Sequence, residues 1–107
     1  MIDHYTLDAN NNPIPCTLQE WSDLYETQYG KAKRRVAEDT VNGYRIWTVF
    51  LGIDHGFGMY KEPMLFETMI FGGRGEEDYQ ERCATWQQSE EMHKRAIKYV
   101  ENGCKHD

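Results

Sequence analysis

Two neighbouring titratable residues, Asp54 and His55, lie in a glycine-rich segment over residues 52–63, and Glu67 follows in an apolar run. A carboxylate beside an imidazole can orient the ring as a general base, and both groups can ligate a metal ion. Together with His93, they would supply enough donors for a carboxylate–imidazole site. The alternative is structural, with an Asp that caps the turn and a His that packs beneath it. Asp54, His55 and Glu67 are therefore the candidate catalytic residues, while no dedicated metal site or cofactor is predicted.

Glu67 is the single carboxylate within the apolar run over residues 64–71. If its side chain points inward, it must be paired or hydrogen-bonded, because burying an isolated carboxylate is costly. An ion pair with Arg45 or Arg35 across a sheet is the structural interpretation. A carboxylate held for binding or catalysis is the functional one.

Aromatic and charged residues near these positions are candidates for ligand binding. The set comprises Arg45, Trp47, Asp54, His55, Phe57, Glu67, Trp86 and His93. On the apolar stripe of its predicted helix, His93 has the alternative role of a hydrogen-bonded core histidine. A basic run, Lys33, Arg34 and Arg35, is the candidate partner-binding surface of an otherwise acidic chain. Its alternative role is the solvated start of a strand.

Composition and charge limit the class of protein. The chain has 107 residues, of which 39% are hydrophobic, and this predicts a single domain over residues 1–107. Its net charge of -6 disfavours direct binding to nucleic acid or to an anionic membrane. The apolar runs fall far short of the roughly 20 residues that a membrane-spanning helix needs, and no signal segment is expected. Three cysteines without a C-x-x-C pair fit free thiols in a reducing compartment. We therefore expect a cytoplasmic protein without membrane contact.

Capping signals predict two helices. Thr17 and Glu20 form the capping-box pattern, in which a hydroxyl and a carboxylate satisfy backbone amides that the first helical turn leaves unpaired. Thr85 and Gln88 repeat this pattern further along the chain. The first helix is expected within residues 17–30; it covers residues 18–28 and stops at Gly30. The second helix is expected within residues 85–102.

The segment between the helices predicts an antiparallel sheet over residues 33–83. Asn42 and Gly43 tolerate the positive φ of a type I′ turn, so they indicate a hairpin between strands at 36–40 and 44–51. A third strand is expected at 64–71 and a charged edge strand at 79–83. Residues 1–16 are expected to form an N-terminal arm with a short strand at 4–7.

The two central strands are apolar on both faces over most of their length. A small antiparallel sheet normally has one wet face, so helices are expected to cover one side while the arm or a second subunit meets the other. The predicted fold is therefore α+β: a small antiparallel sheet of three to four strands, with a central β-hairpin, packed against two helices. A homodimer is one way to cover the second face.

Several motifs of the chain resemble one protein family. These are TVFLGIDH at residues 48–55 and LFETMIFGG at residues 65–73, followed by Glu81-Arg82, Thr85-Trp86 and His93. They resemble a family of small, functionally uncharacterised proteins encoded by bacteriophages and prophages. In that family a proline pair commonly precedes the LFET segment and a small residue precedes TVFLG, whereas this chain has Pro63-Met64 and Trp47 there. The resemblance implies a phage origin and a place in the host cytoplasm, but it supplies no reaction.

Two hypotheses of function follow. The first is a phage accessory binding protein that inhibits a host defence or regulatory component, by binding a host protein or by sequestering a small nucleotide signal. The second is a small hydrolase or lyase, or a metal-dependent enzyme, that uses Asp54, His55 and Glu67.

Overall fold

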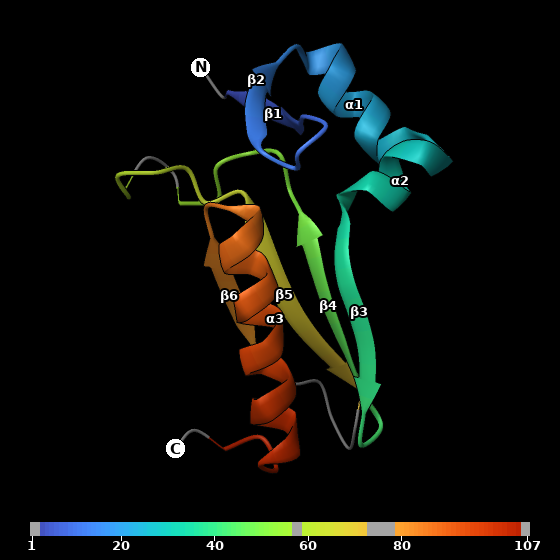
Figure 1. Cartoon of the computed structure of the whole chain (residues 1–107), viewed down its shortest axis with the longest axis vertical. Coiled ribbons are helices and arrows are strands. Elements are labelled where there is room, and N and C mark those ends of the chain that lie inside the picture. Colours follow the sequence, from blue (N-terminus) through green and yellow to red (C-terminus); the bar gives the residue numbers. More distant parts are fainter. Residues whose placement is uncertain (1–2, 57–58, 73–78, 106–107) are drawn as a thin grey trace.

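The computed structural model describes residues 3–56, 59–72 and 79–105. These residues form three helices and two antiparallel sheets, arranged as in Figure 1, which confirms the predicted α+β class. The elements follow in the order β1 (His4–Leu7), β2 (Pro13–Cys16), α1 (Leu18–Glu26), α2 (Gln28–Arg34), β3 (Arg35–Val41), β4 (Tyr44–Phe50), β5 (Phe66–Gly72), β6 (Gln80–Cys83) and α3 (Trp86–Glu101). In the described part of the chain, no helix combines the length and apolar composition needed to cross a bilayer.

The larger sheet is a four-stranded meander in the order β3-β4-β5-β6, with antiparallel neighbours throughout. Asn42 and Gly43 form the predicted turn between β3 and β4, with φ angles of 51° and 82°. Both angles are positive, as a type I′ turn requires, so the sequence pair and the hairpin agree. The predicted fourth strand is confirmed as β6, which is short, as an edge strand often is.

Helix α3 lies across one face of this sheet (Figure 1). Thr85 and Gln88 form its predicted capping box. A buried apolar cluster joins the helix to the central strands through Ile46, Ile70, Ala96 and Val100. Because side chains alternate along a strand, the residues next to Ile46 in β4, Arg45 and Trp47, must point to the opposite face.

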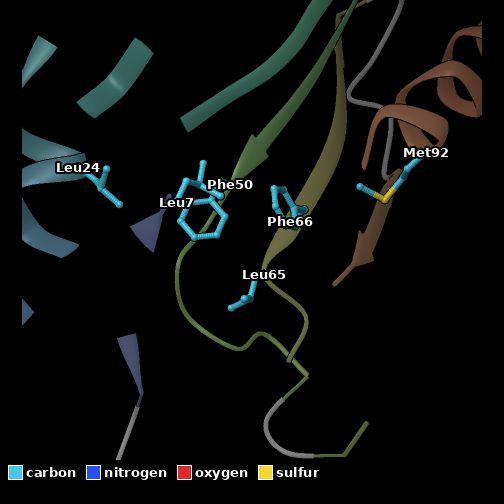
Figure 2. Packing of buried hydrophobic residues seen from close by; sticks show 6 residues of the cluster. All are labelled: Leu7, Leu24, Phe50, Leu65, Phe66 and Met92. Carbon is cyan, nitrogen blue, oxygen red and sulfur yellow. The ribbon is translucent and has the colours of Figure 1, made fainter. Parts of the chain in front are cut away.

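The N-terminal hairpin and helix α1 pack at one end of the sheet, where β4 finishes (Figure 1). The indole Nε1 of Trp21, at 3.1 Å, and the hydroxyl of Tyr25 both donate to the carbonyl of Leu51. The amide of Tyr5 donates to the carbonyl of Gly52 at 2.8 Å. Figure 2 shows the buried cluster that joins this end to the sheet and to α3, made by Leu7, Leu24, Phe50, Leu65, Phe66 and Met92.

The prediction of one helix ending at Gly30 was wrong. Thr27 breaks the helix in an extended conformation, with φ −98° and ψ 152°, and its hydroxyl then caps α2 by accepting from the amide of Gly30 at 2.9 Å. Gly30 lies inside α2 because the two helices touch there: a Cβ would stand 2.5 Å from the Cα of Leu24. The glycine thus permits close backbone approach and does not stop the helix.

Covering of the second sheet face by the arm is also contradicted. The hairpin β1–β2 pairs with itself and contacts α1 and the end of the sheet. Phe71, at the far end of β5 on the face opposite α3, is 44% exposed. Among the described residues, no helix or strand lies over that part of the face.

Candidate functional site

Asp54 organises the glycine-rich loop after β4. Its Oδ1 accepts from the backbone amides of Gly56 and Met64, each at 2.8 Å. The amide of His55 donates to the carbonyl of Met64 at 3.0 Å, so the two ends of the loop are tied together. One carboxylate satisfying two backbone donors is the turn-capping role that was the alternative for this residue.

His55 is half-buried in the same loop, and its Nδ1 lies 2.8 Å from the carbonyl of Ile53. A carbonyl oxygen only accepts hydrogen bonds, so Nδ1 carries the proton and Nε2 of the neutral ring is an acceptor. The imidazole lines a cleft of about 240 Å³ together with Tyr60, Met64, Gln80 and Arg82. This cleft lies between the loop and the edge strand β6.

Glu67 is 7% exposed and receives a hydrogen bond from Nε of Arg82, with Nε and Oε2 2.8 Å apart. The expected partners, Arg45 or Arg35, are wrong: Nε of Arg45 donates to Glu38 at 2.8 Å. Glu67 and Arg82 face each other in the register of β5 and β6, which places both side chains on the same side of the sheet. The candidate carboxylate is therefore connected to the cleft of His55 through an arginine.

The sheet surface opposite α3 is the second candidate site, and we call it the open face. The guanidinium of Arg45 lies over the ring of Trp47, with its carbon 4.4 Å from the ring centroid. Beneath it, Nε1 of Trp47 is buried without a hydrogen-bond partner, a condition found at no other side-chain N or O atom of the described residues. The open face comprises Arg35, Glu38, Arg45, Trp47, Glu67, Met69, Phe71 and Arg82. Three arginines and two glutamates give it a local positive excess in a chain of net charge -6.

His93 is 4% exposed and lies between α3 and the sheet. Its Nδ1 is 2.7 Å from the hydroxyl of Thr48, its Nε2 is 2.8 Å from Oδ2 of Asp39, and Thr48 bonds Thr68 in turn. The order Asp–His–hydroxyl resembles the arrangement that activates a nucleophile. However, both threonines are 0% exposed, so a substrate has no access to the hydroxyl. His93 is therefore a hydrogen-bonded core histidine, which was one of the two roles that the sequence left open.

The remaining candidates do not join a common site. Trp86 packs edge-on against Phe66, with the ring centroids 6.2 Å apart, on the α3 side of the sheet. Phe57 falls outside the described residues. The candidate ligand-binding residues thus divide among the open face, the loop and the buried side of α3.

The basic run lies mainly on a helix, and its interpretation as a strand start holds for Arg35 alone. Lys33 and Arg34 occupy the last turn of α2, and Arg35 begins β3. Nε of Arg34 donates to the carbonyl of Leu24, and its guanidinium carbon stands 3.9 Å from the centroid of the Tyr25 ring. Burial raises the pKa of Tyr25, and the charge of Arg34 opposes that shift. Arg34 therefore helps to hold α1 against α2.

Sequence reasoning missed Arg82, Tyr60, Gln80 and Asp39. Gln80 and Arg82 are two positions apart in the edge strand, and this spacing could have placed both side chains on one face of the sheet. Their distance from His55 in the chain gave no indication that the loop folds back onto β6. Asp39 lies in β3 on the face of the sheet that α3 covers, and its hydrogen bond to His93 depends on how the helix packs on the sheet, so no local sequence signal could have shown it.

Within the residues that the structure describes, no three His, Cys, Asp or Glu side chains gather as a possible metal-ligand set. Comparison with protein-family models found no matching family, and comparisons with curated proteins and with solved structures found no match.

Proposed function

We propose that this protein is a small phage accessory protein that acts in the host cytoplasm by binding a host protein, and that it thereby inhibits a defence or regulatory component. The observation that carries the proposal is the open face. It combines a cation stacked on an indole with an exposed Phe71 and a half-buried Met69, on a rigid four-stranded sheet. Aromatic residues, Met and Arg are the types enriched at protein interfaces.

The charge of the open face favours an acidic partner surface. Arg45 and Arg82 each pair with a glutamate of the face. Nε of Arg35 lies 3.8 Å from Oε2 of Glu38, but that glutamate is already paired with Arg45. One positive charge is therefore left over, at the end of the face nearest α2. A partner with an apolar ridge that meets Phe71 and Met69, and with a carboxylate beyond the Met69 end of that ridge, would match the face and this excess charge.

Catalysis by Asp54, His55 and Glu67 has less support. The carboxylate of Asp54 is engaged by two backbone amides and that of Glu67 by Arg82. The contact of His55 on its Nδ1 side is a carbonyl and not a carboxylate, so no acid–base pair is assembled from these three residues. Among the cysteines, Cys83 is a poor nucleophile because burial raises its pKa to about 11.

The test compares capture of host proteins by the wild type and by two open-face variants, Arg45→Glu and Phe71→Asp. Tyr29→Asp is the matched control, because Tyr29 is 78% exposed on α2 and is not a residue of the open face. We expect one host protein to be captured by the wild type and the control and to be lost in both variants. That protein should then bind the purified wild type directly in calorimetry.

Native mass spectrometry of the unliganded protein separates this proposal from its alternatives. A homodimer that dissociates on Phe71→Asp would make the open face a contact between copies and would contradict the host-protein proposal. A nucleotide that remains bound through purification would favour sequestration of a signal.

A further inference from the structure

The cleft between the loop and β6 has a composition unlike that of the whole chain. Among its described lining residues, Arg82 and His55 are the groups that can carry positive charge, and none is a carboxylate. Tyr60, Gln80 and Met64 complete the lining. In a chain with six more acidic than basic residues, a concave site without acidic lining favours an anionic occupant.

Arg82 is held in place with its donors available. Its Nε is fixed by Oε2 of Glu67 at 2.8 Å, and among the described residues the terminal nitrogens make one further hydrogen bond, a long one of 3.5 Å from Nη2 to Gln80. A guanidinium has five N–H donors, so Nη1 and Nη2 can bind two oxygens of one ligand. Glu67 orients the guanidinium through this ion pair, and because it is almost fully buried it does not itself line the cleft.

His55 adds a group of the opposite hydrogen-bonding character. With Nδ1–H directed to the carbonyl of Ile53, the polar atom left to the cleft is Nε2, which accepts when the ring is neutral and donates when it is protonated. The ligand must therefore offer anionic oxygens to Arg82 and share a proton with Nε2.

A phosphate monoester meets both requirements, because its second ionisation has a pKa of about 6. Near that pH the phosphate either shares its remaining proton with Nε2 or, as the dianion, accepts a hydrogen bond from the protonated ring, whereas a carboxylate has lost its proton well below that pH. The size of the site agrees. A cleft of about 240 Å³ is smaller than the roughly 300–1,000 Å³ of pockets that enclose a whole small ligand, so it fits one terminal group.

We propose that the cleft of His55 and Arg82 binds the phosphate group of a small phosphate monoester, with Nη1 and Nη2 of Arg82 and Nε2 of His55 as its contacts. Glu67 is a positioning residue that sets the orientation of the guanidinium. Tyr60 lines the cleft and is 62% exposed, so it offers a ring on which the rest of a nucleoside monophosphate can stack. The cleft shares Arg82 with the open face, but the host-protein test changes Arg45 and Phe71, which do not line the cleft, so either proposal can fail alone.

The experiment is an amide NMR titration at pH 7 with three probes: inorganic phosphate, AMP and acetate. We expect phosphate and AMP to shift amides of the loop and of β6, with acetate at least tenfold weaker. Tighter binding of AMP than of phosphate would show that the nucleoside contributes, while equal binding would show that the phosphate group is sufficient.

Arg82→Gln and His55→Gln should each weaken phosphate binding, the arginine variant about tenfold or more, because charge-assisted hydrogen bonds are lost. Lys31→Gln removes an exposed cation on α2, outside the cleft and the open face, and is the matched control that should leave binding unchanged. Glu67→Gln should retain most of the affinity, since its amide oxygen still accepts from Nε, whereas Glu67→Ala should lose it.

Three results would overturn the proposal. The first is an absence of amide shifts with both phosphate and AMP at tens of millimolar. The second is acetate binding as tightly as phosphate, and the third is phosphate affinity that persists in His55→Gln and in Arg82→Gln. If Arg82→Gln does not fold, His55→Gln leaves the buried pair of Glu67 and Arg82 intact and decides the question alone.

Discussion

Replacing His93 with alanine should destabilise the protein more than any exposed substitution on α3. The ring joins the helix to two strands, with hydrogen bonds of 2.7 Å to Thr48 in β4 and 2.8 Å to Asp39 in β3. It is also 4% exposed, so its removal leaves a cavity between helix and sheet.

The magnitude follows from these contacts. Two hydrogen bonds with net contributions of about 0.5–1.5 kcal/mol each give about 1–3 kcal/mol. The Asp39 bond lies at the lower end, because the carboxylate side chain is 51% exposed and water replaces the ring. Lost packing around the missing ring adds about 1–2 kcal/mol. The total of about 2–4 kcal/mol is a large part of the roughly 5–15 kcal/mol that stabilises a domain of this size.

Urea unfolding monitored by tryptophan fluorescence measures this loss. With a slope of about 2 kcal/mol per molar urea, the middle of the usual range, the midpoint of His93→Ala should fall by about 1–2 M. Lys94→Ala, at the exposed neighbouring position on α3, is the control and should stay within about 0.5 kcal/mol of the wild type. Asp39→Asn keeps an acceptor for the ring and should cost less than about 1 kcal/mol. A His93→Ala variant as stable as the Lys94→Ala control would refute the assignment of His93 to the core.

Three further predictions concern single residues. Burial raises the pKa of Cys83 to about 11, so at pH 9 its thiolate should be roughly 50-fold less populated in the native protein than in the unfolded chain. Alkylation of the native protein, followed by mass spectrometry, should be correspondingly slow, and the free energy of unfolding should fall as the pH rises from 9 to 11. Equal alkylation rates in native and unfolded protein would contradict this. Thr85→Ala removes the cap of α3 and should cost about 1 kcal/mol in urea unfolding, whereas no change would show that the cap is dispensable. Gly52→Ala combines a φ of 76° with a Cβ 2.7 Å from Trp21 and should be clearly more destabilising than Gly43→Ala, which has a φ of 82° but no atom within 4 Å; equal costs would show that only the φ angle matters.

Local signals in the sequence determined most of the secondary structure. The capping boxes at Thr17 and Thr85 and the turn at Asn42 depend on residues within four positions of one another, and each lies where it was predicted. Short-range hydrogen bonds and backbone preferences need no distant partner, so the sequence reveals them. The α+β class then followed from an uninterrupted run of strand patterns between two helical ones.

Only the tertiary structure decided the role of each polar residue in the candidate site. The sequence suggested Arg45 or Arg35 as the partner of Glu67, but the register of β5 and β6 places Arg82 opposite it. The same is true of His93, whose partners lie 45 and 54 positions away in the chain. Contacts of that range depend on how sheet and helix dock, and docking is set by burial of the whole apolar surface.

Gly30 illustrates the same division within a few residues. Its type predicted a helix stop, because glycine is common at helix ends. The structure places it inside α2, where the Cα of Leu24 leaves no room for a side chain. The sequence by itself thus showed a glycine at a position where the helix could end. The packing of α1 against α2 decided that this glycine permits close backbone approach and does not end the helix.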